Sequence, residues 1–110
     1  DTHGHPVGDR VLQQVAQCCQ HLLRKNECLA RWGGEEFLVA VPEVDPISLR
    51  ALAERLRKSI AELAVESVPQ ISASVGIALV QEGDSVAGLL QRVDQALYRA
   101  KKLGGNVVAS

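Results

Sequence analysis

The chain has 110 residues, a length that suits one domain with a single modest core. Hydrophobic residues make up 46% and charged residues 23%, which is the balance of a globular protein and excludes an intrinsically disordered one. Twelve basic and thirteen acidic residues give a net charge of −1, so the chain has no positive surplus for binding a nucleic acid or an anionic membrane. The longest apolar run, Phe37 to Val41, is too short to span a bilayer.

Helical spacing of apolar residues predicts a first helix from Val7 to Leu23. Asp9 falls in its expected first turn, where the helix dipole favours a negative charge. The expected buried stripe is Val7, Val11, Leu12, Val15, Cys19, Leu22 and Leu23. The three cysteines (Cys18, Cys19 and Cys28) are an odd number, and two are adjacent. We therefore expect buried free thiols in a soluble cytoplasmic protein, and no disulfide scaffold.

Two short apolar stretches follow, Cys28 to Trp32 and Phe37 to Pro42. They are separated by Gly33-Gly34, and glycines accept the positive φ angles of tight turns. This pattern predicts a β-hairpin. A second helix is expected from Ile47 to Leu63, with a buried stripe of Leu49, Leu52, Ala53, Leu56, Ile60 and Leu63.

Strict alternation from Ile71 to Leu79 predicts one strand with two unlike faces. One face carries large apolar residues and the other only small ones, which implies that something packs closely against the small face. The small residues are Ser72, Ser74, Gly76 and Ala78.

A third helix is expected to begin at the cap Ser85 and to end at Gly104-Gly105, before a short strand from Asn106 to Ala109. Its expected buried stripe is Val86, Leu89, Leu90, Val93, Leu97 and Ala100. The order of elements predicts a single α+β domain over residues 1–110, with helices packed on a mostly antiparallel sheet.

The run Gly33-Gly34-Glu35-Glu36 is the first candidate for chemistry. Glycines at a turn leave room for a phosphate, and a carboxylate beside them suits a divalent cation. On the local pattern alone, acidic residues that are simply solvated at a turn remain the alternative.

Four motifs in the right order make the chain resemble GGDEF domains, the family of diguanylate cyclases. They are Asp1 to Asp9, Arg31 to Phe37, Ser72 to Ile77, and Asp94 to Lys101 followed by Gly104-Gly105-Asn106. The resemblance implies the nucleotide-cyclase, ferredoxin-like palm fold and the condensation of two GTP molecules into cyclic di-GMP. It also implies a homodimer, an upstream sensor domain and a magnesium cofactor, for which manganese can substitute.

Carried over by motif position, the resemblance implies roles for residues at both ends of the chain. Glu35 is expected to bind the catalytic Mg²⁺, and Glu36 to act beside it near the ribose hydroxyl or the metal. Gly33 and Gly34 are expected to lie against the triphosphate, Asp9 to accept from guanine, and Lys101 to contact phosphate. Asp9 as a simple helix-start residue and Lys101 as a solvated one are the alternatives.

Upstream of the hairpin, Arg24-Lys25-Asn26-Glu27 is similar to the family's inhibitory R-x-x-D site for the product. There Arg24 would bind a guanine edge and phosphate, and Glu27 would accept from the guanine donors. Glu27 is one methylene longer than the usual Asp. An ordinary exposed loop is the alternative.

The sequence departs from the family pattern in three ways. The first strand with its D-x-D metal motif is missing, the Asn that would precede Asp1 is missing, and Gly105 replaces the Arg of G-R-N. The missing strand would lie in the middle of the sheet, so we expect a truncated domain, or a slot that another chain fills.

Two functions of different classes follow from the resemblance. The first is a cyclase domain of a longer bacterial signalling protein, which we expect to be inactive as this stretch alone but able to bind cyclic di-GMP. The second is a degenerate domain that senses GTP or cyclic di-GMP without catalysis, which Gly105 favours. A purely structural dimerisation domain ranks third.

Overall fold

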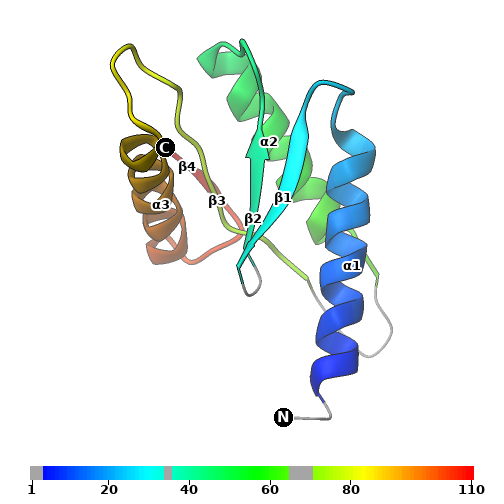
Figure 1. The fold of residues 1–110 in the computed structure, drawn as a ribbon. Coiled ribbons are helices and arrows are strands. Elements are labelled where there is room, and N and C mark those ends of the chain that lie inside the picture. Colours follow the sequence, from blue (N-terminus) through cyan, green and yellow to red (C-terminus); the bar gives the residue numbers. More distant parts are fainter. Residues whose placement is uncertain (1–3, 34–35, 65–70) are drawn as a thin grey trace.

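The structure is a computed structural model that describes residues 4–33, 36–64 and 71–110. Three helices surround two pairs of strands (Figure 1). The elements in chain order are α1 (Gly4–Leu22), β1 (Cys28–Gly33), β2 (Glu36–Ala40), α2 (Pro46–Ala61), β3 (Val75–Gly76), α3 (Val86–Lys102) and β4 (Val108–Ala109).

The predicted hairpin is confirmed. β1 and β2 pair antiparallel from Cys28 opposite Ala40 to Gly33 opposite Glu36, with an irregularity between Arg31 and Gly33. Gly33 therefore belongs to the paired strand itself, one residue further along than the sequence predicts. Gly34 and Glu35 lie outside the described residues.

The predicted strand from Ile71 to Leu79 is much shorter in the structure. Only Val75 and Gly76 form β3, which pairs parallel to β4. Val75 N–H donates to the Val107 carbonyl and Ile77 N–H to the Ala109 carbonyl, at 2.9 Å each. A strand needs a partner backbone along its whole length, and across the described residues β2 and β3 are not hydrogen-bonded to each other.

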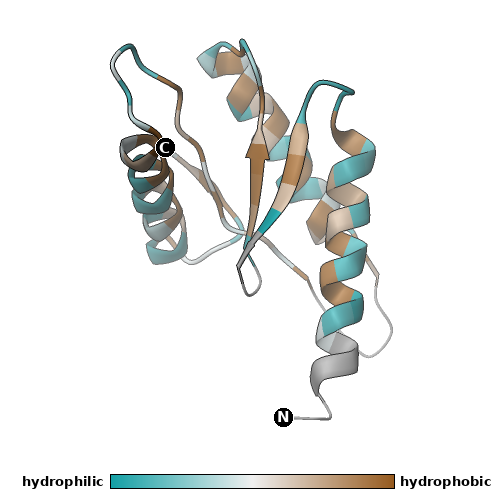
Figure 2. Ribbon diagram, viewed as in Figure 1, coloured by the Kyte–Doolittle hydropathy of each residue, from teal (hydrophilic) through white to brown (hydrophobic). Residues whose placement is uncertain are grey.

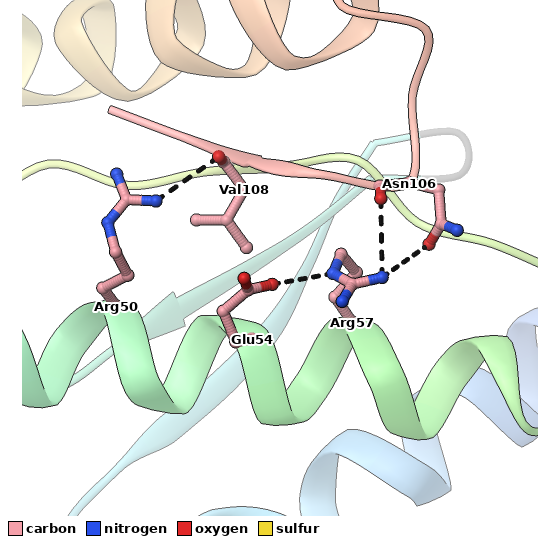
Figure 3. Close-up of polar contacts among 5 residues, drawn as sticks. All are labelled: Arg50, Glu54, Arg57, Asn106 and Val108. Carbon is pink, nitrogen blue, oxygen red and sulfur yellow. Dashed lines mark hydrogen bonds and ion pairs between the residues drawn. The ribbon is translucent and has the colours of Figure 1, made fainter.

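Gly76, on the small face of this segment, lies against α3, and the alternation predicts such a close neighbour. A Cβ added to Gly76 would lie 2.7 Å from Leu97 Cα and 2.8 Å from the Ala96 carbonyl carbon. No side chain fits there, so glycine lets the backbones of β3 and α3 meet. Figure 3 shows β4 between α3 on one side and α2 on the other.

A hydrophobic core lies between α1, α2 and the segment at Ile71. Its buried members are Cys19, Leu56, Ile60 and Ile71. The predicted stripes of α1 and α2 supply most of this cluster. In Figure 2, hydrophobic and hydrophilic bands alternate along α1, whereas β2 is predominantly hydrophobic. In the part of the chain that the structure describes, none of α1, α2 and α3 combines the length with the continuous apolar character that a membrane-spanning helix needs.

The predicted burial of several side chains is wrong, because tertiary packing decides which side chains are covered. Val86, predicted to be buried, is 76% exposed in the first turn of α3, and Ala96, which the predicted stripe left out, is buried where α3 packs on β3. Ala100 is buried as predicted. Cys28 is exposed and Cys18 half-buried, so only Cys19 meets the expectation of a buried thiol.

The ends of α2 and α3 follow local sequence rules. Asp45 caps α2 by accepting from Ser48 N–H at 2.8 Å, and Pro46 follows in the first turn. The hydrogen bonds from Ser48 hold the pKa of the Asp45 carboxyl below its usual value. The predicted cap Ser85 is confirmed, since its hydroxyl accepts from Gly88 N–H at 3.0 Å.

Candidate functional site

The structure joins two of the predicted site residues from opposite ends of the chain. Lys101 lies in the last turn of α3 and Glu36 begins β2, next to the hairpin turn. Lys101 Nζ lies 3.7 Å from Glu36 Oε2, with 58% and 41% of the two side chains exposed. The ammonium is therefore held at the glycine end of the hairpin, where the sequence predicts a triphosphate.

Glu36 also stands at the edge of a groove between β2 and α3. The groove has a volume of about 370 Å³, and α3 contributes the polar residues Gln91 and Asp94 to its mostly apolar lining. The lining residues are Glu36, Phe37, Leu38, Ala87, Leu90, Gln91, Val93, Asp94 and Leu97. Asp94 was not among the predicted site residues, although its spacing of seven from Lys101 places both on one face of a helix.

The glycine turn itself is only partly described. Glu35, the predicted metal ligand, and Gly34 lie outside the described residues, and Gly33 pairs with Glu36 in the hairpin ladder. A divalent cation needs several oxygen ligands. Over residues 4–33, 36–64 and 71–110, no three acidic, histidine or cysteine side chains gather to hold one. The described residues alone do not form a metal site.

Asp9 is exposed on α1, and the helix begins at Gly4, three residues earlier than predicted. Asp9 therefore lies beyond the first turn, which contains no acidic residue. The interpretation of Asp9 as a helix-start residue is wrong, and its predicted role in guanine binding stays a prediction. In Figure 1 the first turns of α1 lie towards the same end of the molecule as the end of β1 and the start of β2.

The loop after α1 lies at the opposite end of the molecule (Figure 1). Arg24 is exposed there, and the Arg24 backbone N–H donates to Glu27 Oε1 at 2.6 Å while Glu27 N–H donates to the Arg24 carbonyl at 3.0 Å. A second turn, from Gln81 to Asp84, has the same hydrogen-bond pattern. Gln81 N–H donates to the Asp84 carboxylate and Asp84 N–H donates to the Gln81 carbonyl. Glu27 thus fixes the loop that presents Arg24, a role that the sequence did not reveal.

Gly105, which stands where the resemblance places an Arg, adopts a left-handed φ of +77°. A Cβ there would lie 3.2 Å from Ser74 Oγ. The backbone angle and the close hydroxyl both favour glycine. Gly105 supplies no cation, and it is Lys101, in the last turn of α3, whose ammonium lies at the hairpin.

Comparison with known proteins gives consistent results. The family model for the diguanylate cyclase GGDEF domain matches residues 1–107. The diguanylate cyclase DgcM of Escherichia coli K12 is 39% identical over 108 residues, which are 98% of this chain and 26% of DgcM. The chain thus spans about a quarter of that relative.

Two solved structures are also similar. The GGDEF domain of DgcB from Caulobacter crescentus, in complex with c-di-GMP, has a TM-score of 0.90 at 31% identity, over 99% of this chain and 67% of that one. The active GGEEF domain of a diguanylate cyclase from Vibrio cholerae has a TM-score of 0.85 at 32% identity, over 96% of this chain and 69% of that one. These likenesses confirm the predicted fold class.

Proposed function

The chain belongs to the GGDEF domain family of diguanylate cyclases, and we propose that it forms part of an enzyme that condenses two GTP molecules into cyclic di-GMP. The observation that carries this proposal is the meeting of Glu36 and Lys101 at the glycine end of the hairpin. One side chain supplies a carboxylate and the other a cation for phosphate, which are the groups that phosphoryl transfer needs. The Vibrio cholerae relative, described as active, is named for the same Gly-Gly-Glu-Glu-Phe motif.

We assign the parts of the site as follows. Gly33 and Gly34 approach the triphosphate, Lys101 contacts a phosphate, and Asp9 accepts from the guanine N1–H and amino group. Cyclases of the family depend on a divalent metal, and we propose Mg²⁺, with Mn²⁺ able to replace it and Glu35 as one ligand. When bound, the metal stabilises charge on the reacting phosphates.

A further strand between β2 and β3 would complete both the sheet and the metal site. β2 and β3 carry no hydrogen bonds to each other in the described parts of the chain, and the groove beside Phe37 and Leu97 opens between β2 and α3. Unpaired strand edges are costly, so we propose that residues outside this sequence, or another chain, supply this strand and the remaining carboxylates. We also propose that the whole enzyme is a cytoplasmic homodimer with a sensor domain in the same protein.

The test is the conversion of GTP to cyclic di-GMP with Mg²⁺, followed by chromatography. We expect no product from the 110-residue chain alone, because its described residues gather no set of carboxylates for a metal, and turnover from the longer protein. In that protein Glu35→Gln should abolish turnover, since an amide is a poor ligand for a hard cation. Turnover within a few-fold of wild type would contradict the role of Glu35.

The second candidate is a domain that binds GTP or cyclic di-GMP without catalysis. Gly105 favours it, because glycine supplies no cation where the family has an Arg. Nucleotide binding by the longer protein without any product would establish this function in place of the first.

A further inference from the structure

The ion pair between Lys101 and Glu36 raises a question that the assigned roles leave open. Lys101 is assigned to phosphate, yet the structure places its ammonium 3.7 Å from a carboxylate oxygen. Neither side chain is buried, and both are long enough to move. An exposed pair of this kind is weak and easily exchanged for another counter-ion.

The placement of the pair is specific. Glu36 is fixed by its position opposite Gly33 in the hairpin ladder, and Lys101 by the last turn of α3. Lys102, the next residue, lies elsewhere, with its ammonium 5.4 Å from the centre of the Tyr98 ring. Of these two adjacent cations, one is therefore directed to the hairpin and the other away from it.

A triphosphate beside Gly33, where β1 ends and β2 begins, would meet both members of the pair. Its oxygens would compete with Glu36 for the Lys101 ammonium, which has three donors on a flexible stem. While the Lys101 ammonium is shared between Glu36 and the phosphate, the Glu36 carboxylate would also repel the phosphate oxygens.

We propose that Glu36 is a positioning residue that holds Lys101 at the hairpin until nucleotide binds, and that Lys101 then exchanges the Glu36 carboxylate for a phosphate of the nucleotide. The inference rests on the proposed function of the site and adds a resting state to it. Breaking the ion pair makes the binding free energy of GTP less favourable, and the size of this effect depends on the presence of both residues. Removing Glu36 therefore makes Lys101 available to phosphate. If Lys101 is removed as well, the loss of Glu36 can no longer act in this way.

The test is the affinity for GTP in the presence of EDTA, measured by calorimetry for four proteins. These are the wild type, Glu36→Gln, Lys101→Gln and the double variant. We expect Glu36→Gln to tighten binding roughly three- to fivefold when Lys101 is present, and by less than about twofold in the Lys101→Gln background. Lys102→Gln is the matched control, because it removes the same charge from the next residue and leaves the pair intact.

Equal gains in both backgrounds would overturn the proposal, because Glu36 would then act by repulsion alone. No gain in either background would overturn it as well. A wild type that binds no GTP, with or without Mg²⁺, would instead contradict the proposed function.

A second measurement does not need nucleotide. The NMR resonance of the Lys101 side-chain nitrogen should shift in Glu36→Gln and should shift in the wild type when inorganic triphosphate is added. A Lys101 signal that Glu36→Gln leaves unchanged would show that no resting pair exists.

Discussion

One nitrogen of Arg57 donates to both oxygens of Asn106, at 3.1 Å to the side-chain Oδ1 and 3.5 Å to the main-chain carbonyl. The same guanidinium donates to Glu54 Oε1 at 2.7 Å through Nε (Figure 3). Arg50, two turns earlier on α2, donates to the Val108 carbonyl at 3.4 Å. The bonds to Asn106 and Val108 tie α2 to β4 and to the residues just before it, and β4 is the strand that pairs with β3.

Replacing Arg57 should loosen this connection. We expect Arg57→Met to lower the free energy of unfolding by about 1–2 kcal/mol, because the substitution removes charge-assisted hydrogen bonds that are only partly screened by solvent. Urea unfolding measures the change. Lys58→Met, at the exposed neighbouring position, is the control and should change stability by less than about 0.5 kcal/mol. Equal effects of the two variants would contradict the role of Arg57.

Two Gly→Ala variants should have opposite effects. Gly76→Ala should destabilise by about 1–3 kcal/mol, since the new methyl would collide with the backbone of α3 at Leu97. Gly8→Ala should stabilise by about 0.5–1 kcal/mol, because Gly8 lies within α1 with no atom near its missing Cβ. Thermal unfolding of both variants tests the packing of α3 on β3. A neutral Gly76→Ala would show that the packing is looser than the structure has it.

Alkaline pH should destabilise the chain through Cys19. Burial raises the pKa of its thiol to about 11 from the ordinary 9.0, and the neighbouring Cys18 adds to the rise. The thiolate therefore forms first in the unfolded chain, so this contribution to stability is complete below about pH 9 and is lost as the pH rises towards 11.

Urea unfolding between pH 8 and 11 measures this loss, with a slope of at most about 1.4 kcal/mol per pH unit. Cys19→Ala should flatten the dependence, whereas Cys28→Ala, at an exposed position, should keep it. An unchanged slope in Cys19→Ala would assign the effect to other groups.

The loop between α1 and β1 should bind cyclic di-GMP independently of the hairpin site, because it lies at the opposite end of the molecule (Figure 1). We expect Arg24→Ala to weaken this binding roughly ten- to a hundredfold, since a bidentate contact to guanine contributes about 1–3 kcal/mol. Calorimetric titration decides, with Lys25→Ala as the neighbouring control.

Glu27 affects the same measurement in a different way. Its carboxylate already closes the loop on the Arg24 backbone, so Glu27→Ala should lower both the affinity for cyclic di-GMP and the order of the loop. The absence of binding by the wild-type chain would return this segment to the status of an ordinary exposed loop.

Local structure and family membership could both be predicted from the amino-acid sequence. The spacing of apolar residues placed all three helices to within a few residues, Ser85 was correctly predicted as a cap, and the glycine-rich run predicted the hairpin. These features depend on residues close together in the chain, whose preferences act before any tertiary contact forms. The small residues around Gly76 likewise predicted a close neighbour without identifying it.

The identity of that neighbour and the length of β3 depend instead on contacts between segments that are far apart in the chain. A strand ends where its partner backbone ends, and sequence alternation from Ile71 to Leu79 carries no information about the partner. The contact between Lys101 and Glu36 has the same origin. It joins the end of one helix to the start of a distant strand, and the packing of α3 on β3, through the missing side chain of Gly76, sets where that helix end lies.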